Sequence, residues 1–403
     1  MWELRKLGDM AQIVRGASPR PIKSTKWFND KSNIGWLRIS DVTSQNGKIT
    51  HLNQRLSEAG QNKTRIINSP HLLLSIAASV GKPVINYIPT GVHDGFLIFL
   101  KPKFEIEYMF QWLTYYQNSW KKYGQPGSQV NLNSDIVKSQ NIFITTIPEQ
   151  KKIESILKQM DNLITLQQRQ LDLYIKLKKG LLQKLFPKDG EKVPEVRFAN
   201  FTGNWKQRKL SELKDLNDKY SFTGGPFGSD LKSSDYTPGG VRIIQLQNIG
   251  DGSFLNNYKI YTSKEKAQAL SSNLIYPGEI IIAKMADPLA RATIIPKVAN
   301  VFLMSSDGIR LKVDTKKYDT YFVLTSINNN SFRKKALENS SGTTRKRIGL
   351  TVLGNLVLNI PKLEEQIKIG RVFRKLDEII ILKQDKIEEL ENLKKYLLQK
   401  LFI

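Results

Sequence analysis

The side chains of this 403-residue chain that could do chemistry gather in basic, polar loops. The first half contains "RGASPRPIKSTKWF" (15–28) and "KKYGQPGSQVNLN" (121–133), and the second contains "TGGPFGSDLKSSDY" (223–236) and "RKKALENSSGTTRKRIG" (333–349). Arg and Lys contact phosphates and guanine edges, Ser, Thr, Asn and Gln hydrogen-bond to base edges, and Gly permits close backbone approach. The loops therefore predict contact with DNA. The alternative for any one of them is an ordinary solvated charged loop.

The candidate DNA-binding residues come from these loops and from the ends of the neighbouring β-rich runs. The densest group is "TTRKR", in which three consecutive cations cannot all face one surface if the loop is extended. The candidates are Arg15, Ser18, Arg20, Lys23, Lys82, Gln125, Ser128, Gln129, Ser229, Lys232, Lys284, Arg291, Thr343, Thr344, Arg345, Lys346 and Arg347.

The sequence shows no recognisable pattern of catalytic residues. The chain has no cysteine, and its three histidines (His51, His71 and His93) lack metal-ligand spacing. No phosphate-binding loop occurs, and "GGPFGS" (224–229) lacks the spacing of a dinucleotide site. The Asn/Asp-Pro-Pro-aromatic motif of amino-group methyltransferases is also absent. We therefore predict a chain without its own catalytic site, metal or cofactor.

The formal net charge of +25 predicts a polyanionic partner. Residues 1–147 carry 18 basic and 9 acidic side chains, and residues 188–360 carry 26 and 16. Such an even division favours two nucleic-acid-binding surfaces over a basic tail or a membrane anchor; a generally Lys-rich proteome is the alternative. No apolar run approaches the roughly 18 residues of a membrane span, and the start lacks the apolar core of a signal peptide. We expect a cytoplasmic protein.

Two long helices must hold these loops in place. At a constant offset of 216, residues 149–186 align without gaps to residues 365–402, and both segments end in nearly the same ten residues, "LKKGLLQKLF" and "LKKYLLQKLF". Pro148 and Pro361 precede the segments, as proline does at helix starts, and neither segment contains an internal proline. The aligned segments predict a matched pair of long helices.

Apolar residues in both segments follow a 4-3-4-3 spacing, which indicates a heptad seam. We predict that the helices pair antiparallel through it, the alternative being that each packs only on its own domain. Both seams carry polar residues at the same two steps, which favours a fixed register. The seam residues are Ile153, Leu157, Met160, Ile164, Gln167 and Lys178 in the first helix, and Ile369, Phe373, Leu376, Ile380, Lys383 and Lys394 in the second.

The rest of the chain repeats in outline. "WELRKLGDM" at Trp2 corresponds to "WKQRKLSEL" at Trp205, and each half mixes short β-rich runs with one helical stretch (106–123 and 318–337). We therefore predict an α+β fold in which two pseudo-repeated domains are joined by two long helices forming an antiparallel coiled coil. The expected order is a first domain (1–147), a helix (148–187), a linker (188–204), a second domain (205–360) and a helix (361–403).

This pattern resembles the specificity subunit of type I restriction–modification systems over essentially the whole chain. The resemblance lies in two variable domains that open near "W..RKL" and end in Ile-Pro, the helices ending in "LLQKLF", and the lead-in "VPEVRFANFTGNW" before the second domain. The first domain departs from the pattern, because no copy of that lead-in precedes Trp2.

The resemblance implies two target-recognition domains, each reading one half of a split double-stranded DNA sequence. It implies that the helices act as a spacer and dock two adenine-N6 methyltransferase subunits, which bind S-adenosylmethionine, and that restriction and translocation subunits join the complex. The residues themselves leave two alternatives open: a coiled-coil adaptor that binds proteins and carries incidental basic charge, and a transcription regulator, which the missing helix-turn-helix pattern disfavours.

Overall fold

A computed structural model describes residues 2–76, 80–123 and 132–402. The chain forms two compact units. Unit 1 comprises Met1–Gln167 and Lys386–Ile403, and unit 2 comprises Gln168–Asp385. Both long helices cross from one unit to the other, so each unit contains one variable domain and a part of each helix.

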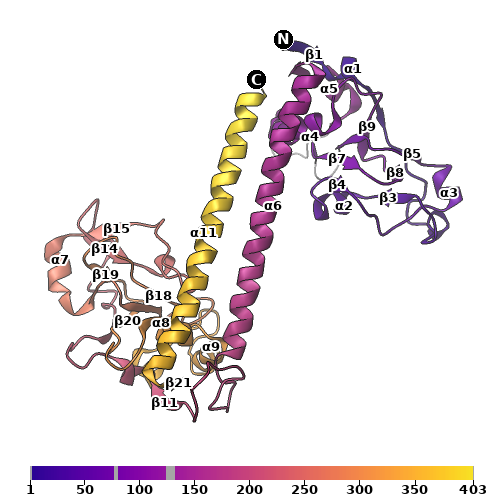
Figure 1. The fold of residues 1–403 in the computed structure, drawn as a ribbon. Coiled ribbons are helices and arrows are strands. Elements are labelled where there is room, and N and C mark those ends of the chain that lie inside the picture. The colour runs from indigo at the N-terminus through magenta and orange to yellow at the C-terminus, as the bar shows by residue number, and fades with distance from the viewer. Residues whose placement is uncertain (1, 77–79, 124–131, 403) are drawn as a thin grey trace. The chain divides into compact units, whose positions relative to one another are not determined.

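The two long helices are α6 (Ile147–Lys184) and α11 (Leu363–Leu401), both continuous in Figure 1. Within unit 2 they pair antiparallel, because Gln170 of α6 contacts Lys383 of α11 whereas Lys178, further along α6, contacts Asp377, earlier in α11. The seam side chains are buried or partly buried along both helices, while flanking positions are exposed. None of the helices within the described residues is long and apolar enough to cross a membrane.

The described residues of unit 1 form three sheets, ordered β2-β9-β6-β7-β4, β3-β8-β5 and β1-β10. Its strands are β1 (Glu3–Lys6), β2 (Gln12–Arg15), β3 (Gly35–Leu37), β4 (Lys48–Ile49), β5 (Arg65–Ile67), β6 (Leu72–Ser75), β7 (Pro83–Asn86), β8 (Thr90–Val92), β9 (Phe96–Leu100) and β10 (Asn141–Ile144). Its helices besides α6 and α11 are α1 (Leu7–Met10), α2 (Ile39–Ser44), α3 (Glu58–Gln61), α4 (Ile106–Tyr116) and α5 (Ser134–Ser139), with short 3-10 turns at Thr25–Trp27 and Gln117–Tyr123.

Unit 2 also contains three sheets, ordered β12-β20-β17-β18, β13-β15-β14-β19-β16 and β11-β21. Its strands are β11 (Lys206–Lys209), β12 (Phe222–Gly224), β13 (Tyr236–Thr237), β14 (Val241–Ile244), β15 (Ile260–Thr262), β16 (Leu274–Ile275), β17 (Ile280–Ala283), β18 (Ala292–Ile294), β19 (Phe302–Met304), β20 (Gly308–Leu311) and β21 (Val357–Ile360). Its shorter helices are α7 (Lys264–Ala269), α8 (Thr320–Ile327), α9 (Asn330–Glu338) and α10 (Leu350–Asn355), with 3-10 turns at Leu210–Leu213, Ser233–Asp235, Leu246–Asn248 and Ser271–Asn273.

The variable domains share one topology, as the outline repeat predicted. The strand order β2-β9-β6-β7 in unit 1 corresponds to β12-β20-β17-β18 in unit 2. In the second sheet of each unit, a central strand (β8 or β19) pairs parallel with the strand on one side and antiparallel with the strand on the other. Unit 2 adds β13 and β15 at the edge of this sheet, and unit 1 adds β4 next to β7 at the edge of the first sheet.

The helical stretch expected at 318–337 is divided into α8 and α9. Asn328 hydrogen-bonds through its side chain to both the N–H and the carbonyl of Ala292, and Asn329 caps α9 by accepting from the N–H of Ser331. Asn side chains compete with the helical backbone in this way, so the chain turns where the sequence pattern alone suggested one helix.

The repeated "LLQKLF" endings lie in the domain cores. Leu185 and Phe186, which directly follow α6, belong to the core of unit 2, where Phe186 stacks on Phe322 at 5.5 Å between ring centroids. Phe402, which directly follows α11, belongs to the core of unit 1 and meets Tyr108 edge to face at 5.3 Å between ring centroids. Each helix end thus completes the other domain.

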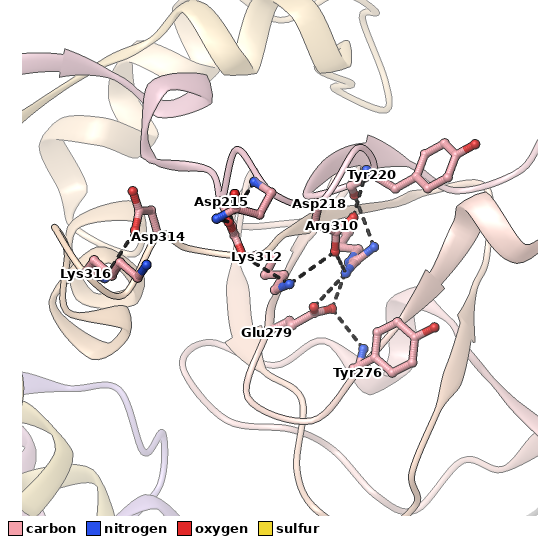
Figure 2. Close-up of polar contacts among 10 residues, drawn as sticks. Asp215, Asp218, Tyr220, Tyr276, Glu279, Arg310, Lys312, Asp314 and Lys316 are labelled. Carbon is pink, nitrogen blue, oxygen red and sulfur yellow. Dashed lines mark hydrogen bonds and ion pairs between the residues drawn. The ribbon is translucent and has the colours of Figure 1, made fainter.

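A buried ion network holds the loop before β12 in unit 2 (Figure 2). Arg310 donates to Glu279 at 2.7 and 2.8 Å and to Asp218 at 2.6 Å. Lys312 extends the network to Asp215 at 3.1 Å. The side chain of Arg310 is only 4% exposed, so these carboxylates supply the charge compensation that a buried guanidinium requires.

Candidate nucleic-acid interface

Three candidate residues of unit 1 converge on Asp94, in the turn between β8 and β9. Arg15, at the end of β2, donates through Nε to the Asp94 carbonyl at 2.6 Å. Ser18 donates to one carboxylate oxygen of Asp94 at 2.9 Å, and Arg20 to the other at 2.6 Å. Although burial opposes it, the Ser18 hydrogen bond and the nearby cations lower the pKa of Asp94. This Asp94 cluster of Arg15, Ser18, Arg20 and Asp94 has a net charge of +1.

The corresponding turn of unit 2, between β19 and β20, brings together Lys284 and Arg347. Lys284 follows β17 and donates through Nζ to the Ser306 carbonyl at 3.0 Å, and Arg347 forms an ion pair with Asp307. Burial lowers the pKa of Lys284, and the positive charge of Arg347 lowers it further. In both turns an acidic residue therefore pairs with an arginine from a loop that is distant in sequence, Arg20 in unit 1 and Arg347 in unit 2.

The run "GTTRKR" forms the tip of a hairpin in unit 2. Ser341 and Arg347 exchange two backbone hydrogen bonds of 2.9 Å, which close the loop. Gly342 has a φ of 91°, and a Cβ there would lie 2.6 Å from the carbonyl oxygen of Arg345, so the tight turn requires glycine. Thr343, Thr344, Arg345 and Lys346 are exposed at the tip. Adding Arg345 and Lys346 to Lys284, Arg347 and Asp307 gives this hairpin region a net charge of +3.

The remaining loop candidates are separate from these clusters or have structural contacts. Arg291 donates to the Leu246 carbonyl at 2.9 Å, and the backbone of Lys232 donates to Asp235 in a short cap. Ser229 contacts the adjacent Asp230, Lys23 is exposed, and Lys82 is partly buried just before β7. Gln125, Ser128 and Gln129 lie outside the described residues.

The polar seam residues of the helices make matched ion pairs. In unit 2, Lys178 contacts Asp377 at 2.6 Å, and in unit 1, Lys394 contacts Asp161 at 2.6 Å. Lys178 and Lys394 are related by the 216-residue offset, and so are Asp161 and Asp377. Lys383 donates to Gln170 at 2.6 Å, and Gln167 is partly exposed. The apolar seam residues Ile153, Leu157, Met160, Ile369, Phe373 and Leu376 are buried, and Ile164 and Ile380 are partly buried.

The same two aspartates also attach the helices to the variable domains. Gln111 of α4 donates to Asp161 at 2.7 Å, and Tyr321 of α8 donates to Asp377 at 2.7 Å. Burial and the charge of Asp377 raise the pKa of Tyr321, which keeps its hydroxyl protonated as a donor. One carboxylate per unit therefore contacts both the other long helix and the variable domain.

A matched glutamine fastens the start of each long helix. The side-chain oxygen of Gln150 accepts from the N–H of Glu105 at 2.9 Å, and that of Gln366 accepts from the N–H of Asp319 at 3.0 Å. Both glutamines are 1% exposed. Because Glu105 and Asp319 immediately precede α4 and α8, each glutamine holds the equivalent point of its domain.

Sequence reasoning missed Asp94 and Asp307, which organise the cationic clusters. Single acidic residues in short turns have no distinguishing pattern, so no sequence signal identified them. Asp161 and Asp377 were visible as repeat matches and Lys178 and Lys394 as polar seam positions. The sequence did not show that these lysines and aspartates pair with each other in space.

Comparison with known proteins follows the same division of the chain. The model of the type I restriction modification DNA specificity domain matches twice, at residues 1–176 and 203–392. Among curated proteins of Methanocaldococcus jannaschii, the type I restriction enzyme MjaVIII specificity subunit is 24% identical, covering 98% of this chain and 90% of its own. The putative MjaX specificity subunit is 25% identical, covering 98% and 91%.

Two solved structures share the fold. The type I restriction–modification S subunit from M. genitalium aligns with a TM-score of 0.63 at 13% identity, covering 100% of this chain and 96% of that one. A chain from a study of complex assembly and conformational transition in the type I system aligns with a TM-score of 0.55 at 17% identity, covering 99% and 97%.

Proposed function

The chain belongs to the type I restriction–modification DNA specificity family, and on this premise we propose that it reads a split double-stranded DNA sequence, with each variable domain contacting one half. Family membership makes it a specificity subunit rather than a catalytic one. The two matches to the family model together cover most of the chain. We therefore do not retain the alternative of a coiled-coil adaptor that binds proteins.

The observation that carries the proposal is the repeated cationic turn next to the main sheet of each unit. Each unit has one such cluster, at Asp94 in unit 1 and at Asp307 in unit 2, as a reader of two half-sites requires, although the cations come from different loops of the repeat. We assign base and phosphate contacts to Arg15, Ser18 and Arg20 in unit 1, and to Lys284 with the 341–347 hairpin in unit 2.

The long helices serve, in this proposal, as a spacer and as the docking element for two adenine-N6 methyltransferase subunits. Those subunits bring S-adenosylmethionine, and restriction and translocation subunits complete the assembly. In this proposal the chain needs no cofactor of its own and works in the cytoplasm. Continuous helices suit this role because α6 and α11 each contribute to both units.

Methylome sequencing tests the proposal. Cells that express the chain with its methyltransferase subunit should show N6-methyladenine at one split motif with a fixed gap. Replacing residues 205–360 by the variable domain of another specificity subunit should change one half of the motif and leave the other intact. A motif that changes in both halves, or methylation that does not depend on this chain, would refute the assignment.

A further inference from the structure

Phe227 is the most exposed large apolar side chain in the described part of the chain, with an exposed fraction of 81%. It lies in the segment "GPFGSDL" (225–231) directly after β12, which we call the Phe227 loop. Single apolar side chains are common on protein surfaces, so exposure alone identifies no site. The surroundings of the ring decide whether it has a partner.

The chain is held on both sides of the ring. The N–H of Gly225 donates to the carbonyl of Gly308 in β20 at 2.8 Å, and the N–H of Asp230 donates to the carbonyl of Phe227 at 2.9 Å. Leu231 is 9% exposed and belongs to a core cluster of unit 2. The ring therefore stands out from a loop whose two ends are anchored.

The first anchor of the Phe227 loop is the cationic turn between β19 and β20. A Cβ on Gly225 would lie 1.8 Å from the carbonyl oxygen of Ser305, so the loop start leaves no room for a side chain. A Cβ on Gly224 would lie 2.7 Å from Nζ of Lys284. Two residues of chain reach at most about 7–8 Å, so the backbone of Phe227 lies within that distance of the turn.

The 341–347 hairpin borders the same surface. The N–H of Ile348, directly after the hairpin, donates to the carbonyl of Lys284 at 2.9 Å, and Arg347 pairs with Asp307 of the turn. The net charge of +3 arises from Lys284, Arg345, Lys346 and Arg347 against Asp307. An exposed ring beside such a charge suits a polyanion that also has apolar faces for stacking, and DNA offers both.

Unit 1 begins the corresponding loop in the same way but carries a polar side chain at the position of the ring. The N–H of Gly16 donates to the carbonyl of Phe96 at 2.9 Å, as Gly225 donates to Gly308 at the equivalent start of β20. Two residues further along, unit 1 has Ser18, which hydrogen-bonds within the cationic turn of its own unit. The exposed ring is therefore a feature of unit 2.

We propose that Phe227 is a wedge that inserts between two stacked base pairs at the half-site contacted by unit 2 and bends the DNA there. This inference rests on the proposed function, because it gives one residue of that DNA-contacting surface a specific role. Phenylalanine is among the side chains that partly unstack a base step and kink the duplex by about 20–90°. The neighbouring cations hold the phosphates while the ring enters.

The wedge adds a sequence preference without a hydrogen bond. Pyrimidine–purine steps (TA and CA/TG) unstack most easily, so the ring favours such a step in or beside its half-site. Ser18 of unit 1 has no ring to insert. We therefore expect local unstacking by the chain in one half of the split sequence only.

Fluorescence of 2-aminopurine tests the wedge in the complex of the full chain with its methyltransferase subunits. The probe brightens where a base loses its stacking, and it replaces single adenines in and beside each half-site of the motif found by methylome sequencing. Target adenines are left out, because methyltransferases flip that base themselves. The parent complex should raise the fluorescence at least about twofold at one step of the half-site assigned to unit 2 by the domain replacement above.

Phe227→Ala should abolish this rise and weaken DNA binding by about five- to 150-fold, the range for removing an aromatic ring that stacks on a base. The slope of log K against log salt should not change, because the ring neutralises no phosphate. Phe227→Leu should keep most of the rise, since leucine also acts as a wedge.

A matched control removes a different exposed apolar side chain of unit 2. Leu216 is 74% exposed and precedes β12, whereas Phe227 follows it. Leu216→Ala should leave the fluorescence and the affinity within about twofold of the parent, as expected for a solitary surface side chain. The melting temperature of Phe227→Ala should equal that of the parent, because the ring is in water.

A parent complex that binds its split motif but unstacks no base outside the target adenines would overturn the wedge and leave the proposed function standing. A Phe227→Ala complex that matches the parent in fluorescence and affinity would do the same. If Phe227→Ala instead lowers the amount of methyltransferase subunit bound in the absence of DNA, the ring is a protein contact and the wedge is wrong. A parent complex without preference for a split motif would overturn both proposals.

Discussion

Arg310 of β20 and Ile98 of β9 occupy equivalent positions in the main sheets of the two units, but Arg310 is charged and Ile98 is apolar. Ile98 lies opposite Leu73 in unit 1, and Arg310 lies opposite Ile281 in unit 2. The apolar side chain of Ile98 needs no hydrogen-bonding or charged partner. The guanidinium instead requires Glu279 and Asp218, and in return it anchors the loop before β12.

We expect Arg310→Met to destabilise unit 2 by about 3 kcal/mol, because it leaves Glu279 buried without its cation. Adding Glu279→Met should recover much of this loss, since an apolar pair needs no charge compensation. Hydrogen exchange of peptides from β17 and β20 measures the effect locally. The matched control, Ile98→Met in unit 1, should cost less than about 1.5 kcal/mol. A double variant as unstable as the single one would contradict this account.

The same network makes unit 2 sensitive to acid. Burial acts to raise the pKa of Asp218, but the backbone N–H of Tyr220 and the charge of Arg310 outweigh it and lower the pKa below the usual value. A lowered folded-state pKa stabilises the protein above the unfolded value of about 3.9 and loses that contribution as the pH falls through the folded value. The stability difference between the parent chain and Asp218→Asn should therefore be constant near neutral pH and shrink below about pH 4 in urea titrations.

The 341–347 hairpin contains cationic side chains in two different environments. Arg347 is paired with Asp307, so its removal also exposes a carboxylate, whereas Arg345 and Lys346 are exposed at the tip. Arg345→Ala/Lys346→Ala should weaken DNA binding by the methyltransferase complex and reduce the slope of log K against log salt by about 0.9 for each phosphate that the variant no longer neutralises. Arg208→Ala/Lys209→Ala, which removes the same charges from the exposed strand β11 of the same unit, should leave the slope unchanged. Equal slopes for both variants and the parent would exclude the hairpin.

At the scale of elements, the helices are built as one matched pair. Lys178–Asp377 and Lys394–Asp161 place equivalent ion pairs in unit 2 and unit 1. A helix of 38 residues, the length of α6, spans about 57 Å. If the helices set the spacing of the half-sites, their length and the gap in the DNA motif must change together.

Inserting four residues after both Gln168 and Gln384 lengthens each helix by about 6 Å. With base pairs rising about 3.4 Å, the gap between half-sites should grow by one or two base pairs, allowing for DNA bending, while the bases of each half-site stay the same. Methylome sequencing measures both. The control inserts four residues into α6 alone, which misaligns the seam and should abolish methylation. An unchanged gap with altered half-sites would contradict the spacer model.

At the scale of the whole molecule, the chain exchanges its helix ends between units. The first variable domain is completed by the last residues of the chain, including Leu398 and Phe402. The second is completed by the helix that follows the first, including Phe186. Neither variable domain is therefore a contiguous folding unit.

We expect Leu398→Ala/Phe402→Ala to destabilise unit 1 by several kcal/mol, since truncating one buried Phe alone costs about 3–5 kcal/mol. Hydrogen exchange should accelerate in β1, β10 and α4, although these elements are far from the substitutions in sequence. The matched variant Leu182→Ala/Phe186→Ala should instead accelerate exchange in β11, β21 and α8 of unit 2. Local effects confined to the last turn of α11 would contradict this exchange.

The sequence by itself determined the repeat, the two long helices, their polar seam positions and several of the strands. These features are local or periodic, and periodicity can be read directly from the order of residues. The repeat also matched Gln150 to Gln366 and Asp161 to Asp377, without showing what these residues do.

Only the tertiary structure decided how the pieces combine. It placed each "LLQKLF" ending in the opposite domain, joined Lys178 to Asp377, and placed Asp94 and Asp307 at the centre of the cationic turns. It also showed that the 318–337 stretch forms two helices, which are separated where Asn328 contacts Ala292. The physical reason is that these partners lie tens to hundreds of residues apart. Their association depends on side-chain packing and charge compensation in the folded core, which leave no periodic pattern in the sequence.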